Sequence, residues 1–297
     1  MDIVSKYKDT DVKQEFSFKK VCIYNSFMST EELAQSLLYT LRTISECPWN
    51  IEMVSEYDLH TEDILYIIVC PRSALGYNVA YPKIYIAYQL EPTYILNRYY
   101  YRQMLSNAYC VWDYSDHNAK ILKNMGINAF YVPVKYTPYI SSNNILNGTQ
   151  IYDDSYKDID VLFLAYDAYP RRQKIKNDLI KTGIKYVAIS DLKIDGMKDV
   201  IKRAKICLNL HSMDNNNCLE ILRLNILLSN QACVVSEDCN TDFDYSVNEF
   251  SDYVHFCKYD DIVSECVKLV NDFERRRKLA HKSYSWYSMN NWITTLK

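Results

Sequence analysis

Residues 205–237 read KICLNLHSMDNNNCLEILRLNILLSNQACVVSE, and the fold prediction starts from this stretch. Residues 206–210 form a short apolar run, as is typical of a buried strand, and a polar loop follows them. Apolar side chains then recur at helical spacing, which predicts a helix over residues 218–230 with Asn217 as its N-cap. A second buried strand is predicted over residues 233–236. The order of strand, loop, helix and strand favours a parallel α/β sheet.

Two charged side chains, Glu220 and Arg223, lie three residues apart and therefore share one face of the predicted helix. The free N–H groups at the helix start near Asn217, together with the helix dipole, attract an anion. The loop also follows a parallel strand, which is where ligands bind in open α/β sheets. These arguments predict an anion-binding site, whereas the spacing alone favours a Glu–Arg surface pair that contributes little to stability.

The same stretch resembles the nucleotide-sugar half of glycosyltransferases with the GT-B fold, particularly the family-4-like members. In that family a strand ends in Asn-Ile-His or similar, a helix carries Leu-Glu-x-x-Arg, and the next strand reads Val-Val-Ser-Glu. The matching residues in this chain are Asn209, His211, Glu220, Arg223, Ser236 and Glu237. The resemblance implies that Glu220 holds the ribose of the donor, that nearby basic groups hold its diphosphate, and that His211 lies close to the phosphate or sugar.

The chain departs from this family pattern at two places. Many members carry a second glutamate before the last strand, in an E-x7-E pattern, but the matching region here holds Asn225 and Ile226. The small residues usual in the following turn are replaced by Asn230 and Gln231. The resemblance therefore leaves the two-glutamate account of donor binding open.

A second strand–helix unit in the same half carries paired arginines. Residues 159–165 form an apolar strand, and Arg171 and Arg172 begin a helix that ends at Gly183. Cations are unfavourable near a helix N-terminus, so this position predicts an anionic ligand, which Arg can bind bidentately. The resemblance places the arginines at the donor diphosphate, and Tyr166 where it narrows the site or stacks on the base. A solvated basic helix face is the plainer alternative.

The front half of the chain alternates strands and helices, which predicts a Rossmann-like sheet. Two of its segments, YQLEP at residues 88–92 and YCVWDYSDHNAKILKNMGINAFYVPVKY at residues 109–136, resemble the acceptor-side domain of the same transferases. Gln89 and Glu91 follow a strand and are expected at its carboxyl end, with Glu91 as a candidate general base for the acceptor hydroxyl. Asp113 is a further acceptor-side candidate. Helix capping is the plainer explanation for Glu91 and Asp113.

One segment without periodicity divides the chain, so we expect two Rossmann-like domains with parallel sheets facing a central cleft. The predicted parts are an N-terminal acceptor-side domain over residues 1–132, a linker over 133–157, a nucleotide-sugar-binding domain over 158–274, and a C-terminal helix over 275–297. The resemblance to GT-B proteins implies that this last helix packs back on the N-terminal domain.

The amino-acid composition indicates which binding partners and which cellular compartment to expect. Of the 297 residues, 48% are hydrophobic and 24% are charged, as in a soluble globular protein. The formal net charge of −3 gives no overall attraction to nucleic acid, so no nucleic-acid partner is expected. Ten scattered cysteines without a C-x-x-C pair, no signal peptide, and no apolar run of ~18 residues predict reduced thiols in a cytoplasmic protein. The basic run 275–278 is a candidate peripheral membrane contact, although a solvated face explains it more simply.

The predicted activity is that of a glycosyltransferase. It would move a sugar from a nucleotide-diphospho-sugar to a hydroxyl of a glycan, protein-linked or lipid-linked acceptor, with no metal and no cofactor besides that co-substrate. A metal-dependent GT-A transferase is one alternative, because Asp158 and Asp160 form a DxD string, but a metal-binding DxD should follow a strand and this one leads into a strand. A non-catalytic nucleotide- or sugar-binding protein is the other. The absence of G-x-G-x-x-G and P-loop motifs argues against an oxidoreductase and a P-loop kinase.

Overall fold

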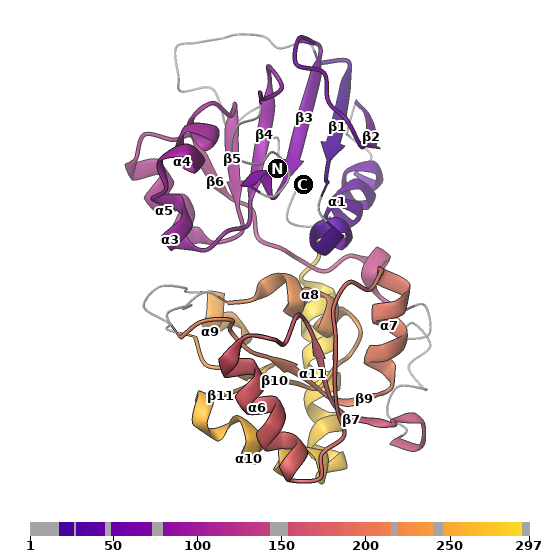
Figure 1. Cartoon of the computed structure of the whole chain (residues 1–297). Coiled ribbons are helices and arrows are strands. Elements are labelled where there is room, and N and C mark those ends of the chain that lie inside the picture. Colours follow the sequence, from indigo (N-terminus) through magenta and orange to yellow (C-terminus); the bar gives the residue numbers. More distant parts are fainter. Residues whose placement is uncertain are drawn as a thin grey trace. The chain divides into compact units, whose positions relative to one another are not determined.

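The computed structural model describes residues 18–26, 28–44, 49–72, 80–142, 154–214, 219–239 and 246–292, without the side chains of residues 246 and 247. The chain divides into two compact units, and each contains one sheet (Figure 1). The first unit comprises Met1–Pro133 and Asn290–Lys297, and the second comprises Val134–Met289. Among the described residues, every pair of neighbouring strands is parallel, and no strand pairs across the two sheets.

Six strands form the sheet of the first unit, in the order β2-β1-β3-β4-β5-β6. They are β1 (Lys20–Tyr24), β2 (Asn50–Val54), β3 (Ile64–Val69), β4 (Tyr85–Gln89), β5 (Cys110–Asp113) and β6 (Ala129–Tyr131). The helices are α1 (Glu31–Thr43), α3 (Thr93–Leu96), α4 (Tyr99–Ser106) and α5 (Asp116–Asn124). Alternate strand residues such as Tyr85 and Ala87 point to one face, where they form a core with Leu96, Tyr101 and Leu122 of the helices.

Five strands form the sheet of the second unit, in the order β11-β10-β9-β7-β8. They are β7 (Ile159–Leu164), β8 (Tyr186–Ile189), β9 (Ala204–Asn209), β10 (Val234–Glu237) and β11 (His255–Cys257). The helices are α6 (Pro170–Lys181), α7 (Ile194–Lys202), α8 (Ile221–Ser229), α9 (Ser246–Phe250), α10 (Ile262–Val270) and α11 (Phe273–Met289). The core of this unit packs Val161, Phe163 and Leu208 of the strands against Leu179 of α6 and Leu269 of α10.

The predicted fold class is confirmed, because each half of the chain forms its own parallel α/β sheet. The stretch from which the prediction started contains β9, α8 and β10, and β9 and β10 are neighbours in the sheet. Gly183 follows α6 with a φ of 84°, a left-handed conformation that suits glycine after a helix end.

The start of α8 differs from the prediction of a helix over residues 218–230. The helix begins at Ile221, and Glu220 occupies the N-cap position with non-helical backbone angles. The Ile221 N–H bonds to the carbonyl of Leu219 at 2.8 Å, a tight turn that a helix does not contain, and the Leu219 side chain is buried. Asn217, the predicted N-cap, lies outside the described residues. Glu220 therefore precedes the helix, and Arg223 lies in its first turn.

The first part of the predicted linker over residues 133–157 groups with the second unit, and residues 143–153 lie outside the described part of the chain. The boundary between the units falls after Pro133. The backbone N–H and the hydroxyl of Ser142 lie 3.0 and 3.1 Å from Oδ1 of Asn230, whose Nδ2 donates to the carbonyl of Ile140 at 2.8 Å. Asn230 thus stands where a small turn residue is usual, and its side-chain amide holds the segment of Ile140 and Ser142 by hydrogen bonds.

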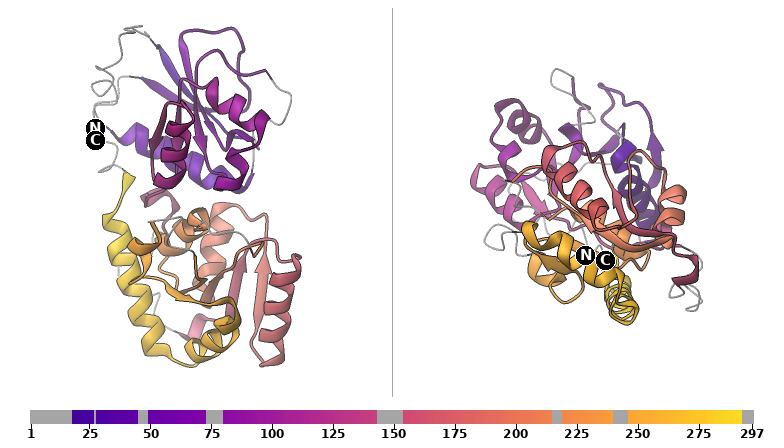
Figure 2. Two further views of the ribbon diagram at one scale, coloured as in Figure 1. Left: turned by 90° about the vertical axis from the view of Figure 1, so that its left-hand side faces the viewer. Right: turned by 60° about the horizontal axis from the view of Figure 1, so that its bottom comes forward.

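The range of the predicted C-terminal helix, residues 275–297, is described as far as Trp292, and its part up to Met289 groups with the second unit. The hydroxyl of Tyr287 donates to Asn225 of α8. Helix α11, yellow in Figure 2, ends at Met289. Only the following residues group with the first unit. There the buried indole of Trp292 lies 6.3 Å from the Tyr88 ring, and its Nε1 donates to the carbonyl of Pro133. None of the described helices is both long enough and apolar enough to cross a bilayer.

Candidate functional site

A cluster of charged side chains lies at the carboxyl ends of β7, β9 and β10 in the second unit. Two of its arginines come from the start of α6, and a glutamate and a third arginine come from the start of α8. A histidine follows β9, and a second glutamate ends β10. The side chains of this cluster are Arg171, Arg172, His211, Glu220, Arg223 and Glu237. Parallel strands bring their carboxyl ends to one sheet edge, which explains why residues so distant in sequence meet there.

Arg171 and Glu237 form a bidentate ion pair. Nη1 and Nη2 of Arg171 donate to the two carboxylate oxygens of Glu237 at 2.7 and 2.6 Å. Nε of Arg171 donates to Asp214 at 2.7 Å, and its guanidinium lies 4.2 Å from the ring centroid of Tyr259. The hydrogen bonds to Glu237 raise the pKa of Arg171 above its ordinary value. This guanidinium is therefore a permanent cation that is paired with the carboxylate of Glu237.

Arg172 has a different set of partners. Its guanidinium is buried and donates to the main-chain carbonyls of Tyr166 at 2.8 Å, Leu210 at 2.9 Å and His211 at 3.3 Å. Within the described part of the chain, no carboxylate lies within 4.0 Å of it. Burial, and after it the charge of Arg223, lowers the pKa of Arg172 to about 10. Arg172 is thus a buried cation without a paired anion, and it remains charged at neutral pH.

Arg223 holds the end of β7 and a neighbouring side chain of β9. Its Nε donates to the carbonyl of Leu164 at 3.1 Å, and its Nη1 donates to Oδ1 of Asn209. Its Nη2 lies 3.6 Å from Oε2 of Glu220. The guanidinium groups of Arg172 and Arg223 lie 5.0 and 5.1 Å from the ring centroid of Phe163. The predicted Glu220–Arg223 pair is present, but much of the hydrogen bonding of Arg223 is directed to the strand ends.

His211 connects the two glutamates of the cluster. Its backbone N–H donates to Glu237 at 3.1 Å, and its ring Nδ1 lies 3.8 Å from Oε1 of Glu220. The ring is buried, and among the described residues Nδ1 has no hydrogen-bond partner. Burial alone would raise the pKa of Glu220, but Arg223 and then His211 outweigh it and lower that pKa below its ordinary value. Glu220 is therefore a carboxylate at neutral pH, beside an imidazole nitrogen that is available for bonding.

Tyr166 lies just after β7 and is 62% exposed. Its ring meets that of Tyr169 edge to face, with centroids 5.9 Å apart. Its carbonyl accepts from Arg172, so the residue is anchored to the cluster while its ring faces solvent. This placement is compatible with stacking on a ligand and does not require it.

The acceptor-side candidates of the first unit form a separate network at the ends of β4 and β5. Gln89 is fully buried, and its Nε2 donates to Oδ2 of Asp113 at 2.7 Å and to the carbonyl of Glu91 at 2.9 Å. Its Oε1 accepts from the hydroxyl of Tyr101 and from the backbone N–H of Glu91. Asp113 is also buried and accepts from the backbone N–H of Ser115. Gln89 and Asp113 therefore brace the loops, while the N-cap of α5 is Ser115, whose hydroxyl accepts from the N–H of Asn118.

Glu91 is the acceptor-side candidate whose carboxylate extends beyond this network. Its Oε2 lies 3.0 Å from Nη1 of Arg72, and its side chain is 16% exposed. The ion pair orients the carboxylate without burying it fully, so a role in proton transfer is stereochemically accessible.

The two aspartates of the DxD string lie at the opposite, amino end of β7. Asp158 accepts from Arg203 at 2.8 and 2.6 Å, and this bonding lowers the pKa of Asp158 to about 2. Asp160 accepts from Lys205 at 2.8 Å. Each carboxylate is engaged by a cation at or just before the start of β9, which explains the DxD string as structural.

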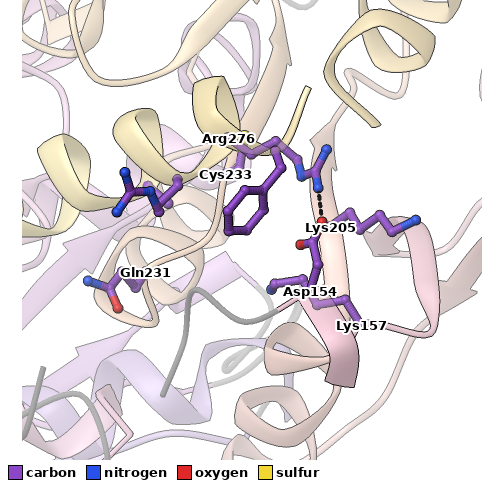
Figure 3. A pocket seen from close by; sticks show the side chains of 9 residues that line it. Asp154, Lys157, Lys205, Gln231, Cys233 and Arg276 are labelled. Carbon is purple, nitrogen blue, oxygen red and sulfur yellow. Dashed lines mark hydrogen bonds and ion pairs between the residues drawn. The ribbon is translucent and has the colours of Figure 1, made fainter. Parts of the chain in front are cut away.

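A cavity of about 20 Å³ also lies at this amino edge (Figure 3). Arg276 faces it but donates to the carbonyls of Leu269 and Val270 and to Asp154. Lys157 donates to the carbonyls of Lys202 and Ala204. The space holds about one water molecule, and its cations are used by the fold. Because Arg276 is buried, it is not part of an exposed basic surface over residues 275–278.

Sequence reasoning did not assign a role to Glu237, to Tyr259 or to Cys239, although each borders the cluster. Cys239 lies 3.4 Å from Nε2 of His211. Glu237 was identifiable, because a charged residue at the end of an apolar strand is expected at the ligand edge of a parallel sheet. No comparable signal marks Tyr259, whose hydroxyl donates to the carbonyl of Arg171 from a distant segment.

Comparison with known sequences finds distant relatives. No protein-family model matches the chain. Two uncharacterized proteins of Acanthamoeba polyphaga mimivirus match it, one at 28% identity over 188 residues and the other at 27% over 161 residues. These matches cover 62% and 54% of this chain, and 61% and 50% of the relatives. The chain therefore spans less than two thirds of the length of either relative.

Solved structures match most of the chain. The T4 phage protein BGT in complex with UDP and Mn²⁺ matches with 14% identity and a TM-score of 0.53, covering 91% of this chain and 95% of that one. An alpha1,3-fucosyltransferase matches with 9% identity and a TM-score of 0.53, covering 91% and 82%. An alpha-glucosyltransferase in complex with UDP and a 13-mer DNA matches with 10% identity and a TM-score of 0.53, covering 92% and 96%. The chain thus has the GT-B fold of these glycosyltransferases, whereas the narrower family-4-like resemblance stays a prediction.

Proposed function

We propose that this chain is a glycosyltransferase that moves a sugar from a nucleotide-diphospho-sugar to an acceptor hydroxyl. The observation that carries the proposal is the charge at the carboxyl edge of the second sheet. Glu237 neutralises Arg171 and Glu220 neutralises Arg223, while the buried Arg172 has only carbonyl partners among the described residues. A buried cation without an anion is costly, and a bound diphosphate would offset that cost. The fold agrees with this, since similar structures contain UDP.

The proposed donor site uses each group of the cluster for one part of the ligand. Glu220, an ionised carboxylate, accepts hydrogen bonds from the ribose hydroxyls. Arg171, Arg172 and the first backbone N–H groups of α6 face the diphosphate, because the N-terminus of that helix favours an anion. His211 donates from Nδ1 to a phosphate or sugar oxygen. Tyr166 stacks on the base. We also propose that Asn217 contacts the donor.

The proposed acceptor is a hydroxyl of a glycan, protein-linked or lipid-linked molecule, with Glu91 as its general base. Arg72 orients the Glu91 carboxylate at 3.0 Å, so the base would be held in place before the acceptor arrives. Gln89 and Asp113 act on this base indirectly, through the buried network that fixes the loop of Glu91. The reaction is proposed to need no metal and no cofactor besides the donor, and to take place in the cytoplasm.

Donor binding is tested by calorimetry with a nucleoside, its monophosphate and its diphosphate. Glu220→Gln preserves the shape of the side chain and removes the charge that the ribose hydroxyls would contact. We expect this variant to bind nucleoside diphosphate about 10- to 100-fold more weakly, since hydrogen bonds to charged groups contribute about 1.5–3 kcal/mol. The wild type should prefer the diphosphate over the nucleoside, because only the diphosphate meets the arginines.

The control is Lys174→Ala, which removes an exposed cation of α6 whose Nζ lies 5.3 Å from the ring centroid of Tyr259. Its diphosphate affinity should equal that of the wild type. Equal affinities of folded Glu220→Gln and wild-type protein would leave only a surface ion pair and would remove the residue-level support for the donor site. Release of nucleoside diphosphate from a nucleotide-sugar then distinguishes the transferase from a non-catalytic binding protein.

One observation favours a second acceptor class, a nucleic-acid hydroxyl, despite the negative net charge. Residues 92–112 contain no acidic side chain, and the surface of α3 and α4 exposes Tyr99 and Tyr94 beside Arg98 and Arg102. Aromatic rings stack on bases, and arginines contact phosphates. Transfer assays with DNA oligomers and with glycans separate the two classes. Tyr99→Ala should reduce transfer only if a DNA oligomer is the substrate that is used.

A further inference from the structure

A thiol, an imidazole and a carboxylate follow one another in space beside β9 and β10. Sγ of Cys239 lies 3.4 Å from Nε2 of His211, and Nδ1 of the same ring lies 3.8 Å from Oε1 of Glu220. Cys239 and His211 are both buried, with exposed fractions of 9% and 3%. This is the order in which a base lies between a nucleophile and the carboxylate that stabilises its protonated form.

Glu237 also lies close to the thiol–imidazole pair. The backbone carbonyl of Glu237 lies 4.0 Å from Sγ of Cys239, and its carboxylate accepts from the backbone N–H of His211. That carboxylate is itself neutralised by Arg171. Glu220 is therefore the ionised group that lies beside Nδ1 of His211, at 3.8 Å.

The environment of Cys239 differs from that of the other thiols of this unit. Burial raises the pKa of Cys207, Cys233 and Cys257 to about 12, and raises that of Cys266 as well. At neutral pH these four are protonated and inert, because the thiolate is the reactive form. Cys239, in contrast, has an imidazole nitrogen within hydrogen-bonding distance.

We propose that Cys239 is a modification site: a reactive thiol that hydroperoxides oxidise reversibly to a sulfenic acid, with His211 as its base. The Sγ proton moves to Nε2 of His211, and Glu220 stabilises the imidazolium. The thiolate then attacks the terminal oxygen of the peroxide, so the S–O bond forms as the O–O bond breaks. The leaving oxide takes a proton from the imidazolium. With hydrogen peroxide the products are Cys239 sulfenic acid and water, and a thiol reductant restores the thiol.

The first measurement compares two cysteines within the unmodified full chain. Cys257 is more exposed than Cys239, so accessibility alone predicts that Cys257 reacts faster. Activation of Cys239 by His211 predicts the reverse, and so does the raised pKa of Cys257, so the histidine variants are needed to separate these two causes. We expect iodoacetamide to label Cys239 at least about tenfold faster than Cys257 at pH 7, because His211 takes the Cys239 proton whereas Cys257 stays protonated. Peptide mapping by mass spectrometry assigns each rate.

The pH dependence supplies a second test without any substitution. The Cys239 rate should already be near its plateau at pH 7, while the Cys257 rate should still rise above pH 9. Dimedone trapping after treatment with hydrogen peroxide should mark Cys239. Slower labelling of Cys239 than of Cys257, together with a Cys239 rate that rises in parallel with that of Cys257, would overturn the proposal.

Two histidine variants identify the base. His211→Asn should lower the Cys239 labelling rate about tenfold, while His281→Asn, which changes an exposed histidine of α11, should leave it unchanged. Thermal melting confirms that both variants are folded. An unchanged rate in folded His211→Asn protein would rule out His211 as the base.

A labelling experiment with bound ligand links Cys239 to the donor site, and this experiment rests on the proposed function. Nucleoside diphosphate bound beside His211 should slow the labelling of Cys239 and leave that of Cys257 unaffected. Absence of this protection, with the difference between the two thiols intact, would count against the proposed donor position and not against the reactive thiol.

Discussion

Arg172 stabilises the fold, whether or not it also binds a ligand. Its guanidinium donates to three main-chain carbonyls at the ends of β7 and β9, and it is buried while doing so. Arg172→Lys retains the charge, but an ammonium group cannot reach three carbonyls that the planar guanidinium spans. We expect the free energy of unfolding to fall by about 2–3 kcal/mol, measured by urea denaturation, because buried carbonyls would lose their donors.

The control for this prediction is Lys181→Ala in the same helix. Lys181 is exposed and makes a surface ion pair with Asp178 at 2.8 Å, which contributes about 0–1 kcal/mol. If Arg172→Lys were as stable as Lys181→Ala, the carbonyl bonds of Arg172 would not be what stabilises this edge.

At the residue scale, sequence identified the charged groups but not what each one bonds. The pairing of Glu220 with Arg223 follows from their spacing, and the position of the arginines at the start of α6 follows from the apolar strand before it. The carbonyl partners of Arg172 could not be predicted from the sequence, because every residue has a main-chain carbonyl and no residue type marks the ones that accept. The same reason hid the buried bonding of Gln89, whose polar side chain looked suited to a ligand.

At the scale of elements, α8 is fixed by α11 on the side away from the cluster. The buried hydroxyl of Tyr287 donates to Oδ1 of Asn225 at 2.7 Å. Asn225 stands in the region where many GT-B transferases carry a second glutamate, and here it serves helix packing. Tyr287→Phe should lower the free energy of unfolding by about 1–2 kcal/mol, since it leaves a buried amide oxygen without a donor.

Tyr284→Phe is the matched substitution in the same helix. Tyr284 is partly exposed, so its hydroxyl can bond to water in either state, and the change should be close to neutral. Urea denaturation of both variants checks the difference. Equal stabilities would mean that the Tyr287 hydroxyl does not contribute to the docking of α11.

The amino ends of β7 and β9 are joined by an ion pair that titrates in acid. Arg203 lowers the pKa of Asp158 from 3.8 to about 2 in the folded chain. A carboxyl group with a depressed pKa stabilises the fold above its unfolded pKa, and this contribution is lost as the pH falls through the folded value. The wild type should therefore lose this contribution between about pH 4 and pH 2.

Asp158→Asn removes the titrating group and tests this window. The melting temperatures of wild type and variant should differ at pH 6 and should converge as the pH falls toward 2. A constant difference across that range would show that the acid sensitivity comes from other carboxylates.

Elements were predictable where side-chain periodicity determines them. The inner strands of the second unit lie in apolar runs, as in residues 206–210, because buried parallel strands need apolar side chains on both faces. The start of α8 was not predictable to the residue, because the buried Leu219 and its tight turn delay the helix to Ile221. Tertiary burial of one leucine thus overrode a favourable helical pattern.

At the scale of the whole molecule, the chain returns to its first unit after α11. Residues 290–297 group with that unit, although the helix before them belongs to the second. The resemblance to GT-B proteins implied such a return, but it assigned it to a long helix over residues 275–297. The return depends on the side chain of Trp292, which is fully buried. The helical periodicity of the sequence could not locate this change, because Trp286 and Trp292 look equally suited to either unit.

These two tryptophans allow the return of the chain to be tested. Trp292 lies against Tyr88 of β4, and its Nε1 donates to the carbonyl of Pro133, so both partners belong to the first unit. Trp286 is partly exposed and stacks on Tyr253 of the second unit, with ring centroids 4.1 Å apart and an interplanar angle of 6°. Trp292→Ala should reduce stability by about 3–5 kcal/mol, as expected for truncation of a buried aromatic side chain, and Trp286→Ala by less.

Hydrogen exchange followed by peptide mass spectrometry gives the location of each effect. In Trp292→Ala, faster exchange should concentrate in β4 and β5 of the first unit, because the cavity opens beside Tyr88. In Trp286→Ala, it should concentrate in α11 and the segment of Tyr253. If Trp292→Ala instead accelerated exchange in α11 and left β4 protected, residues 290–297 would be an extension of the second unit, and the return of the chain to the first unit would be refuted.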